Sequence, residues 1–169
     1  MIEPEPLADE RGWFTRLFDA EEFHARGMNP QVVQCNASFN ARRNTLRGMH
    51  YQVEPHGESK LVRCARGAIF DVAIDLRSES PAYGGWHGLE LSAENGLSFY
   101  IPAGMAHGFQ TLTDDCEVLY QMGYRYVPEA ATGVRFDDPT FAIEWPVVDG
   151  ERIVSERDLA YPDFQPQAS

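Results

Sequence analysis

Two stretches of the chain place a histidine within an otherwise apolar run. The first runs from Leu46 to Gln52 and reads LRGMHYQ, and the second runs from Tyr100 to Phe109 and reads YIPAGMAHGF. A histidine in such a run can hold a metal, transfer a proton or fill a core. The residues that accompany each histidine decide among these three uses.

The metal interpretation needs more ligands than these stretches offer. The segment from Gly96 to His107 resembles a pattern of the cupins, small jelly-roll barrels: Gly, five residues, Pro-x-Gly, two residues, His. Metal-binding cupins add an earlier His-x-His, but here that strand reads His50-Tyr51-Gln52. Two histidines leave a divalent site short of protein ligands, so we expect no bound metal. The remaining histidines lie in polar or turn contexts and are expected at the surface: His24, His56 and His87.

The distribution of cations is uneven. Six of the fourteen basic residues fall within 25 positions: Arg42, Arg43, Arg47, Lys60, Arg63 and Arg66. Lys60 is the only lysine in the chain. A lysine offers a compact charge with a tunable pKa, which arginine does not, so a chemical role is one explanation. The other is a GC-rich genome that suppresses lysine throughout.

A proton-transfer site is the alternative to a metal. A regular strand would place Arg47 and His50 on opposite faces, so Gly48 is expected to mark a bulge that lets both face inward. The range 117–127 is expected to be one strand, on which Tyr120, Tyr124 and Tyr126 share a face. A base, a cation and a phenol that converge in a barrel suit removal of a proton next to a carbonyl.

The elements that must position these residues are mostly strands. In the range 68–76, AIFDVAIDL, apolar residues alternate with Asp71 and Asp75, which predicts a half-buried strand. The ranges 88–92, 97–102 and 108–113 look similar, and turn clusters separate them. This spacing is typical of a sandwich or jelly-roll barrel. One short helix is expected after Asp19, which can cap it, and before Gly27; from residue 129 onward we expect loops with one short helix.

Composition limits the classes of partner. The 169 residues suit a single domain over 1–169, and the net charge of -12 disfavours binding to nucleic acid or to an anionic membrane. No apolar run approaches the roughly 20 residues of a membrane helix, and the acidic start lacks a secretory signal. Three widely spaced cysteines argue against a disulfide framework, which favours a cytoplasmic protein.

The motifs together resemble the nucleotide-sugar 3,5-epimerases typified by dTDP-4-dehydrorhamnose 3,5-epimerase. The resemblance extends over nearly the whole chain, with order and spacing kept. It rests on DERGWF (9–14), LRGMHYQ (46–52), KLVRCARGAIFDVAIDLR (60–77), SPAYGGW (80–86), LSAENG (91–96), IPAGMAHGF (101–109), EVLYQ (117–121), DDP (137–139), IEWP (143–146) and VSERD (154–158). It implies an all-β, cupin-type jelly-roll barrel with a few short helices, an isomerase without cofactor or metal, and a homodimer whose N-terminal segment reaches the partner subunit.

The resemblance also implies a role for each site residue. His50 would remove a proton from C3 or C5 of a 4-keto sugar, and Asp158 would orient it. Lys60 would stabilise the enolate at O4, and Tyr120 would return a proton to the opposite face. The implied substrate-binding set is Arg11, Phe14, Gln34, Asn36, Arg47, His107 and Tyr126. Within it, Arg11 and Arg47 would bind the diphosphate and His107 would line the sugar pocket.

Several positions depart from the family pattern. Arg16 stands where a glutamate usually lies near the nucleobase, Asn40 replaces a serine, and Arg125-Tyr126 replaces a tyrosine pair. The reaction type is therefore expected to be kept, with the nucleotide and sugar open. One alternative is an epimerase of C3 or C5 alone, acting on a GDP- or CDP-linked 4-keto sugar. A metal-dependent cupin and a sugar-binding cupin without catalysis are the others.

Overall fold

The structure is a computed structural model that describes residues 1–165. The last four residues of the predicted domain, 166–169, lie outside the described residues. The strands are β1 (Leu7–Asp9), β2 (Gly12–Phe14), β3 (Gln34–Asn40), β4 (Leu46–Gln52), β5 (Lys60–Arg66), β6 (Ala68–Asp75), β7 (Trp86–Ser92), β8 (Ser98–Ile101), β9 (Met105–Thr111), β10 (Cys116–Met122) and β11 (Ala131–Gly133). The helices are α1 (Ala20–Ala25) and α2 (Glu156–Leu159), and neither has the length or apolar content that crossing a membrane requires.

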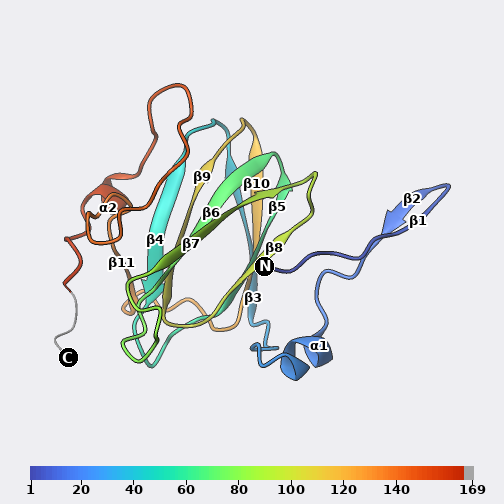
Figure 1. The fold of residues 1–169 in the computed structure, drawn as a ribbon, viewed down its shortest axis with the longest axis horizontal. Coiled ribbons are helices and arrows are strands. Elements are labelled where there is room, and N and C mark those ends of the chain that lie inside the picture. The colour runs from blue at the N-terminus through green and yellow to red at the C-terminus, as the bar shows by residue number, and fades with distance from the viewer. Residues whose placement is uncertain (166–169) are drawn as a thin grey trace.

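Two antiparallel sheets form the barrel (Figure 1). One has the strand order β3-β10-β5-β8 and the other β11-β4-β9-β6-β7. The hairpin of β1 and β2 projects away from them (Figure 1). The prediction of an all-β jelly-roll barrel with a few short helices is confirmed.

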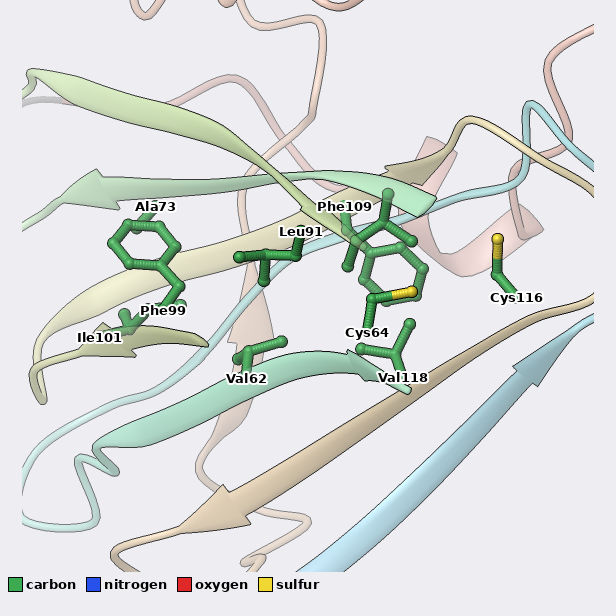
Figure 2. Close-up of a cluster of buried hydrophobic side chains, with 10 residues drawn as sticks. Val62, Cys64, Ala73, Leu91, Phe99, Ile101, Phe109, Cys116 and Val118 are labelled. Atoms are coloured by element: carbon green, nitrogen blue, oxygen red, sulfur yellow. The ribbon is translucent and has the colours of Figure 1, made fainter. Parts of the chain in front are cut away.

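The core between the sheets is apolar over most of its length. Figure 2 shows Val62 of β5, Val118 of β10 and Phe109 of β9 converging from both sheets. Each is at most 1% exposed. Burial of such side chains contributes about 1.5–3 kcal/mol each and holds the two walls of the barrel at a constant distance.

Strand β6 of the five-stranded sheet is buried on both faces, contrary to the half-buried strand expected at 68–76. Ile69 and Ala73 of β6 face the core between the sheets, whereas Val72 and Ile74 face a second core. The C-terminal segment builds that second core with aromatic side chains, Phe136, Phe141, Trp145 and Phe164 among them. Asp71 therefore lies inside the barrel, fully buried, and not on a solvated face.

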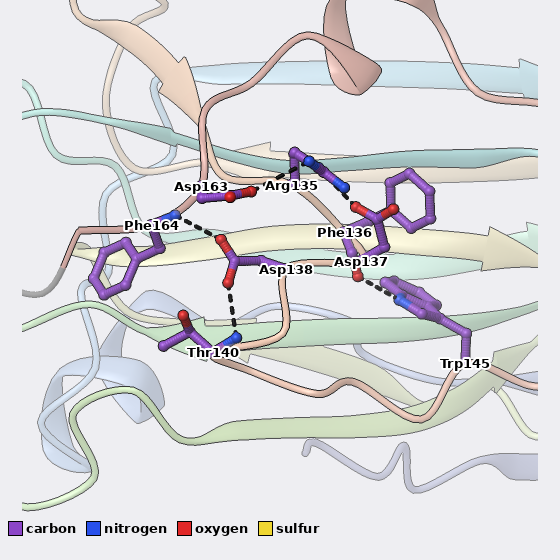
Figure 3. A network of polar contacts seen from close by, with 8 residues as sticks. All are labelled: Arg135, Phe136, Asp137, Asp138, Thr140, Trp145, Asp163 and Phe164. Carbon is purple, nitrogen blue, oxygen red and sulfur yellow. Dashed lines mark hydrogen bonds and ion pairs between the residues drawn. The ribbon is translucent and has the colours of Figure 1, made fainter.

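Polar contacts hold this C-terminal segment in place (Figure 3). Asp138 accepts hydrogen bonds from the backbone N–H groups of Thr140 and Phe164, and the Trp145 indole donates to the Phe136 carbonyl at 2.8 Å. Further along, Leu46 N–H donates to the Ile153 carbonyl at 2.8 Å. These bonds bring the chain that precedes α2 alongside the start of β4.

Helix α1 forms as its sequence predicts. The Asp19 side chain accepts hydrogen bonds from the N–H groups of Glu21 and Glu22, and Gly27 follows with a φ of 72°. The expectation of loops with one short helix after residue 129 is also met, apart from the three-residue strand β11. His24 and His87 are exposed as expected, but His56 is half-buried against Tyr124.

The strand expected over 117–127 ends early, at Met122. At Gly123 the N–H donates to the Ser59 carbonyl, and a β-carbon there would lie 2.2 Å from Ser59 Oγ. The chain therefore turns at this glycine. Tyr124 and Tyr126 lie in the following loop and do not share a strand with Tyr120, so that prediction is wrong.

Asp75 stabilises the turn after β6. Its carboxylate accepts hydrogen bonds from the Arg77 backbone, the Arg77 guanidinium and the Ser80 hydroxyl, and the residue is 3% exposed. These bonds, that of the Arg77 side chain foremost, lower the pKa of Asp75 to about 2. A carboxyl with a lowered pKa stabilises the fold above its unfolded pKa, and this contribution is lost as the pH falls from about 4 towards 2.

We predict that Asp75→Asn lowers the free energy of unfolding by about 2 kcal/mol at pH 7, because each unit of pKa shift is worth about 1.4 kcal/mol. Urea unfolding at a series of pH values measures this, and the difference from wild type should shrink below pH 4. Glu79→Gln, an exposed change in the same turn, is the control. A constant difference between pH 7 and pH 2 would contradict the prediction.

Candidate active site

A bulge at Gly48 turns both Arg47 and His50 inward, as predicted. The register of β4 with β9 shifts between Arg47 and His50, which leaves Arg47 opposite Phe109 and His50 opposite His107. Directly opposed residues of an antiparallel pair share a face, and Phe109 belongs to the core between the sheets. Gly48 has a φ of 139°, and a β-carbon there would lie 2.5 Å from the Gly108 Cα. Only glycine fits that approach.

His50 and Asp158 form a dyad across 108 positions of sequence. His50 Nε2 lies 2.8 Å from Asp158 Oδ1, and the Gly48 N–H donates to Asp158 Oδ2 at 3.1 Å. Burial acts to raise the pKa of Asp158, but the hydrogen bond and charge of His50, with the Gly48 N–H and the Ser155 side chain, outweigh it and lower that pKa. Asp158 is thus a carboxylate near neutral pH and can only accept. His50 Nε2 therefore carries the proton of this bond, and Nδ1, which makes no hydrogen bond within residues 1–165, is suited to act as a base.

Tyr120 enters the barrel from the other sheet. It lies opposite Asn36 of β3 and Val62 of β5, and its ring is 6.1 Å from that of His107. Burial, and next the negative charge of Asp71, raise the pKa of Tyr120 well above that of a free phenol, against the opposing effects of Ser38 and Arg47. Tyr120 is consequently a neutral phenol that can donate a proton.

Lys60 begins β5 and is almost fully buried. It has the same parity as Val62 and Cys64, which face the core between the sheets. Its Nζ donates to the His50 carbonyl at 3.1 Å and lies 3.1 Å from Glu58 Oε1. The lone lysine of the chain is therefore an interior cation beside the candidate base.

His107 is held by a carboxylate and not by a ligand set. Its Nε2 lies 2.8 Å from Oδ1 of Asp71, and both side chains are at most 6% exposed. Gln52, where metal-binding cupins place a histidine, donates to the His56 and Arg125 carbonyls and accepts from the Val127 N–H. Within residues 1–165, no three His, Cys, Asp or Glu side chains are grouped to hold a metal ion.

Arg47 lies on the same face of β4 as His50 but has no carboxylate partner among the described residues. Its Nε donates to Asn40 Oδ1 at 2.7 Å, and in the described part of the chain it forms no ion pair. The residue is exposed to solvent. An arginine with an unneutralised charge and free N–H groups is suited to bind an anion.

Gln34 and Asn36 belong to the edge strand β3, and Tyr126 belongs to the loop after β10. Asn36 is opposite Tyr120 and is exposed. Gln34 Oε1 accepts the Tyr126 N–H at 2.6 Å, which fixes the loop after β10 to the edge strand β3. The structure thus groups these three predicted residues with the other candidate site residues His50, Lys60, Tyr120, Asp158, Arg47 and His107.

Arg11 and Phe14 are not brought there within one chain. They belong to the hairpin that projects from the barrel (Figure 1). Arg11 pairs with Asp9 of the same hairpin, and Phe14 is 65% exposed. Arg16, at the position of a family glutamate, pairs with the helix cap Asp19 at 2.9 Å.

Three interior side chains at this site are absent from the predicted set: Glu58, Asp71 and Ser38. Asp71 appears in the strand alternation, but a two-residue period does not tell which face is solvated once both faces are buried. Arg157 is a further omission, because it lies next to Asp158 and bonds to the Tyr126 side chain. The sequence could have indicated Arg157, because it directly precedes Asp158 in the stretch VSERD (154–158).

Comparison with known proteins identifies the family. The family model described as dTDP-4-dehydrorhamnose 3,5-epimerase matches residues 1–166. The chain belongs to this family. The predicted resemblance and enzyme class, an epimerase among the isomerases, are confirmed.

Individual relatives are similar to this chain over most of their length. The dTDP-4-dehydrorhamnose 3,5-epimerase of Methanothermobacter thermautotrophicus is 48% identical over 94% of this chain and 85% of the relative. The crystal structure of the dTDP-4-dehydrorhamnose 3,5-epimerase from Elizabethkingia anophelis has a TM-score of 0.93 at 39% identity, covering 96% of this chain and 88% of that one. The Legionella pneumophila dTDP-6-deoxy-D-glucose-3,5-epimerase, solved with dTDP-4-keto-L-rhamnose, gives 0.85 at 37% identity over 96% and 92%.

We predict that Asp158→Asn lowers epimerase turnover by about 10²- to 10⁴-fold while the protein stays folded. An amide can donate to Nε2, which would place the His50 proton on Nδ1 and remove the free lone pair there. Turnover and circular dichroism measure the two properties. Glu156→Gln on the same helix is the control. Turnover of Asp158→Asn within threefold of wild type would contradict the dyad.

Proposed function

We propose that this enzyme inverts C3 and C5 of a dTDP-linked 4-keto-6-deoxy sugar by removing and returning protons next to the C4 ketone. The observation that carries the proposal is the position of a base and an acid on opposing sheets. His50, with a free Nδ1, lies on the five-stranded sheet, and the neutral phenol of Tyr120 lies on the four-stranded sheet. Inversion of a carbon needs a proton taken from one face and delivered to the other.

In the first step His50 Nδ1 takes the proton from C3 or C5. The electron pair of the C–H bond forms a double bond to C4, and the C4–O π pair moves onto O4. Lys60, which donates one N–H to the His50 carbonyl and forms an ion pair with Glu58, keeps a further N–H that stabilises this enolate oxygen. Asp158 stabilises the imidazolium formed at His50.

In the second step Tyr120 gives its proton to the opposite face of the carbon. The O4 electron pair restores the ketone, and the former double-bond pair forms the new C–H bond. The products on the protein are a phenolate and an imidazolium, and proton exchange with solvent resets both. Arg47 near the phenol favours its ionised form.

We propose that Arg47 and Arg157 bind the diphosphate, and that Gln34, Asn36, His107 and Tyr126 complete the substrate contacts. The substrate carries negative charge into a protein of net charge -12, so local cations must attract it. Arg47 has no carboxylate partner in the part of the chain described here, which leaves its charge available. The dTDP-sugar named for the Legionella structure supports thymidine as the nucleoside.

We also propose a homodimer in which the hairpin of each copy completes the site of the other. Leu7, Trp13 and Phe14 of the hairpin are 65–72% exposed, an apolar surface that a second copy would cover. Arg11 and Phe14 would then meet the substrate from the neighbouring chain. Each chain would act as one epimerase domain, and its free Cys35, Cys64 and Cys116 suit the reducing cytoplasm.

The reaction is tested by proton NMR in deuterated water with a dTDP-4-keto-6-deoxyhexose. Deuterium is expected at both C3 and C5, and His50→Ala should slow its entry by at least about 10². Tyr120→Phe should still allow exchange but lose inversion, because the enolate forms without an acid on its other face. Tyr100→Phe, whose phenol bonds to Asn29 outside the site, is the control. Exchange at one carbon only would identify a single-position epimerase, and exchange at neither would refute the proposed reaction.

Hairpin exchange is tested by mixing two inactive variants, Arg11→Ala and His50→Ala. In a mixed dimer one site receives both native residues, so refolding the two together should restore about a quarter of wild-type turnover, from random pairing of subunits. Each variant refolded alone is the control. If Arg11 serves its own chain, the mixture stays inactive.

A further inference from the structure

Glu58 forms a buried ion pair with Lys60, one of the proposed catalytic residues. Its side chain is 5% exposed and that of Lys60 is 7% exposed, and 3.1 Å separates Oε1 from Nζ. Glu58 Oε2 is buried with no hydrogen-bond partner among the described residues. A buried pair of charges adds little to stability after desolvation, and a carboxylate oxygen without a partner adds a cost. Stability of the fold therefore does not explain this glutamate.

The two histidines of the site, His50 and His107, are also paired with carboxylates. His50 is paired with Asp158 and His107 with Asp71, each at 2.8 Å. Arg47, which is exposed to solvent, donates a hydrogen bond to the neutral amide of Asn40. A carboxylate thus accompanies His50, Lys60 and His107, and the cation that would meet the diphosphate keeps its charge unneutralised.

The bonds of the Lys60 ammonium fix its direction. An ammonium has three N–H donors. The His50 carbonyl on β4 accepts one of them, and Glu58 Oε1, on the loop before β5, attracts the ammonium from 3.1 Å as an ion pair. A lysine stem is flexible, so two acceptors on different elements are needed to aim the third donor.

We propose that Glu58 is a positioning residue for the reaction, which holds the Lys60 ammonium so that its third N–H faces the substrate O4. This inference rests on the proposed function. Since charge at O4 develops only as the enolate forms, loss of the alignment should lower kcat more than it changes KM.

The test is Glu58→Gln, which keeps the shape and removes the charge. We expect kcat to fall about 10- to 100-fold, less than the loss on removing an oxyanion donor outright, with KM and dTDP affinity within about threefold of wild type. Glu54→Gln, an exposed change on the same loop, should leave kcat unchanged. Wild-type kcat in Glu58→Gln would overturn the proposal, and so would a parallel loss of dTDP affinity, which would indicate a structural role.

Because Lys60 is the only lysine, its ammonium can be observed without assignment. Protein labelled with [¹⁵N]lysine should give one side-chain NH₃⁺ signal, sharp in wild type because two acceptors slow its exchange. In Glu58→Gln the signal should shift and broaden, and in Glu54→Gln it should not. An unchanged signal in Glu58→Gln would overturn the positioning role. Deuterium exchange by the wild type, run in parallel, distinguishes that failure from a failure of the proposed reaction.

Discussion

The close approach of Gly48 to Gly108 is the constraint on which the site depends. A strand with regular pleating puts residues three apart on opposite faces. The bulge at Gly48 cancels this alternation, so Arg47 and His50 both enter the space between the sheets. Without it, His50 would face the second core beneath the C-terminal segment. The two glycines are needed because any β-carbon at either position would overlap the neighbouring backbone.

The C-terminal segment supports this bulged strand from outside the barrel. It covers the outer face of the five-stranded sheet with aromatic side chains and then brings α2 to β4. Asp158 thereby bonds to both the His50 ring and the Gly48 N–H, so one carboxylate fixes the base and the bulge together. A base supported from two sides in this way keeps its geometry during proton transfer.

Electrostatic pairing lets these polar groups remain inside an otherwise apolar barrel. A buried charge without a partner costs several kcal/mol, and the buried Lys60 and His107 each have a carboxylate partner, as the half-exposed His50 does. The phenol of Tyr120 is instead kept neutral by burial and by Asp71, which preserves its proton for donation. The same barrel thus holds one group suited to accept a proton and one suited to donate a proton at the same pH.

The sequence by itself determined the strands near 68–76, 88–92, 97–102 and 108–113, the helix cap at Asp19, the bulge at Gly48 and the family, because strand period, turn residues and motifs are local signals. Only the tertiary structure decided that Asp71 faces inward, that the chain leaves β10 at Gly123 before Tyr124, and that Glu58 meets Lys60 inside the barrel. A period of two distinguishes two faces of a strand but not which is covered. That depends on the C-terminal segment, whose packing brings together residues far apart along the chain.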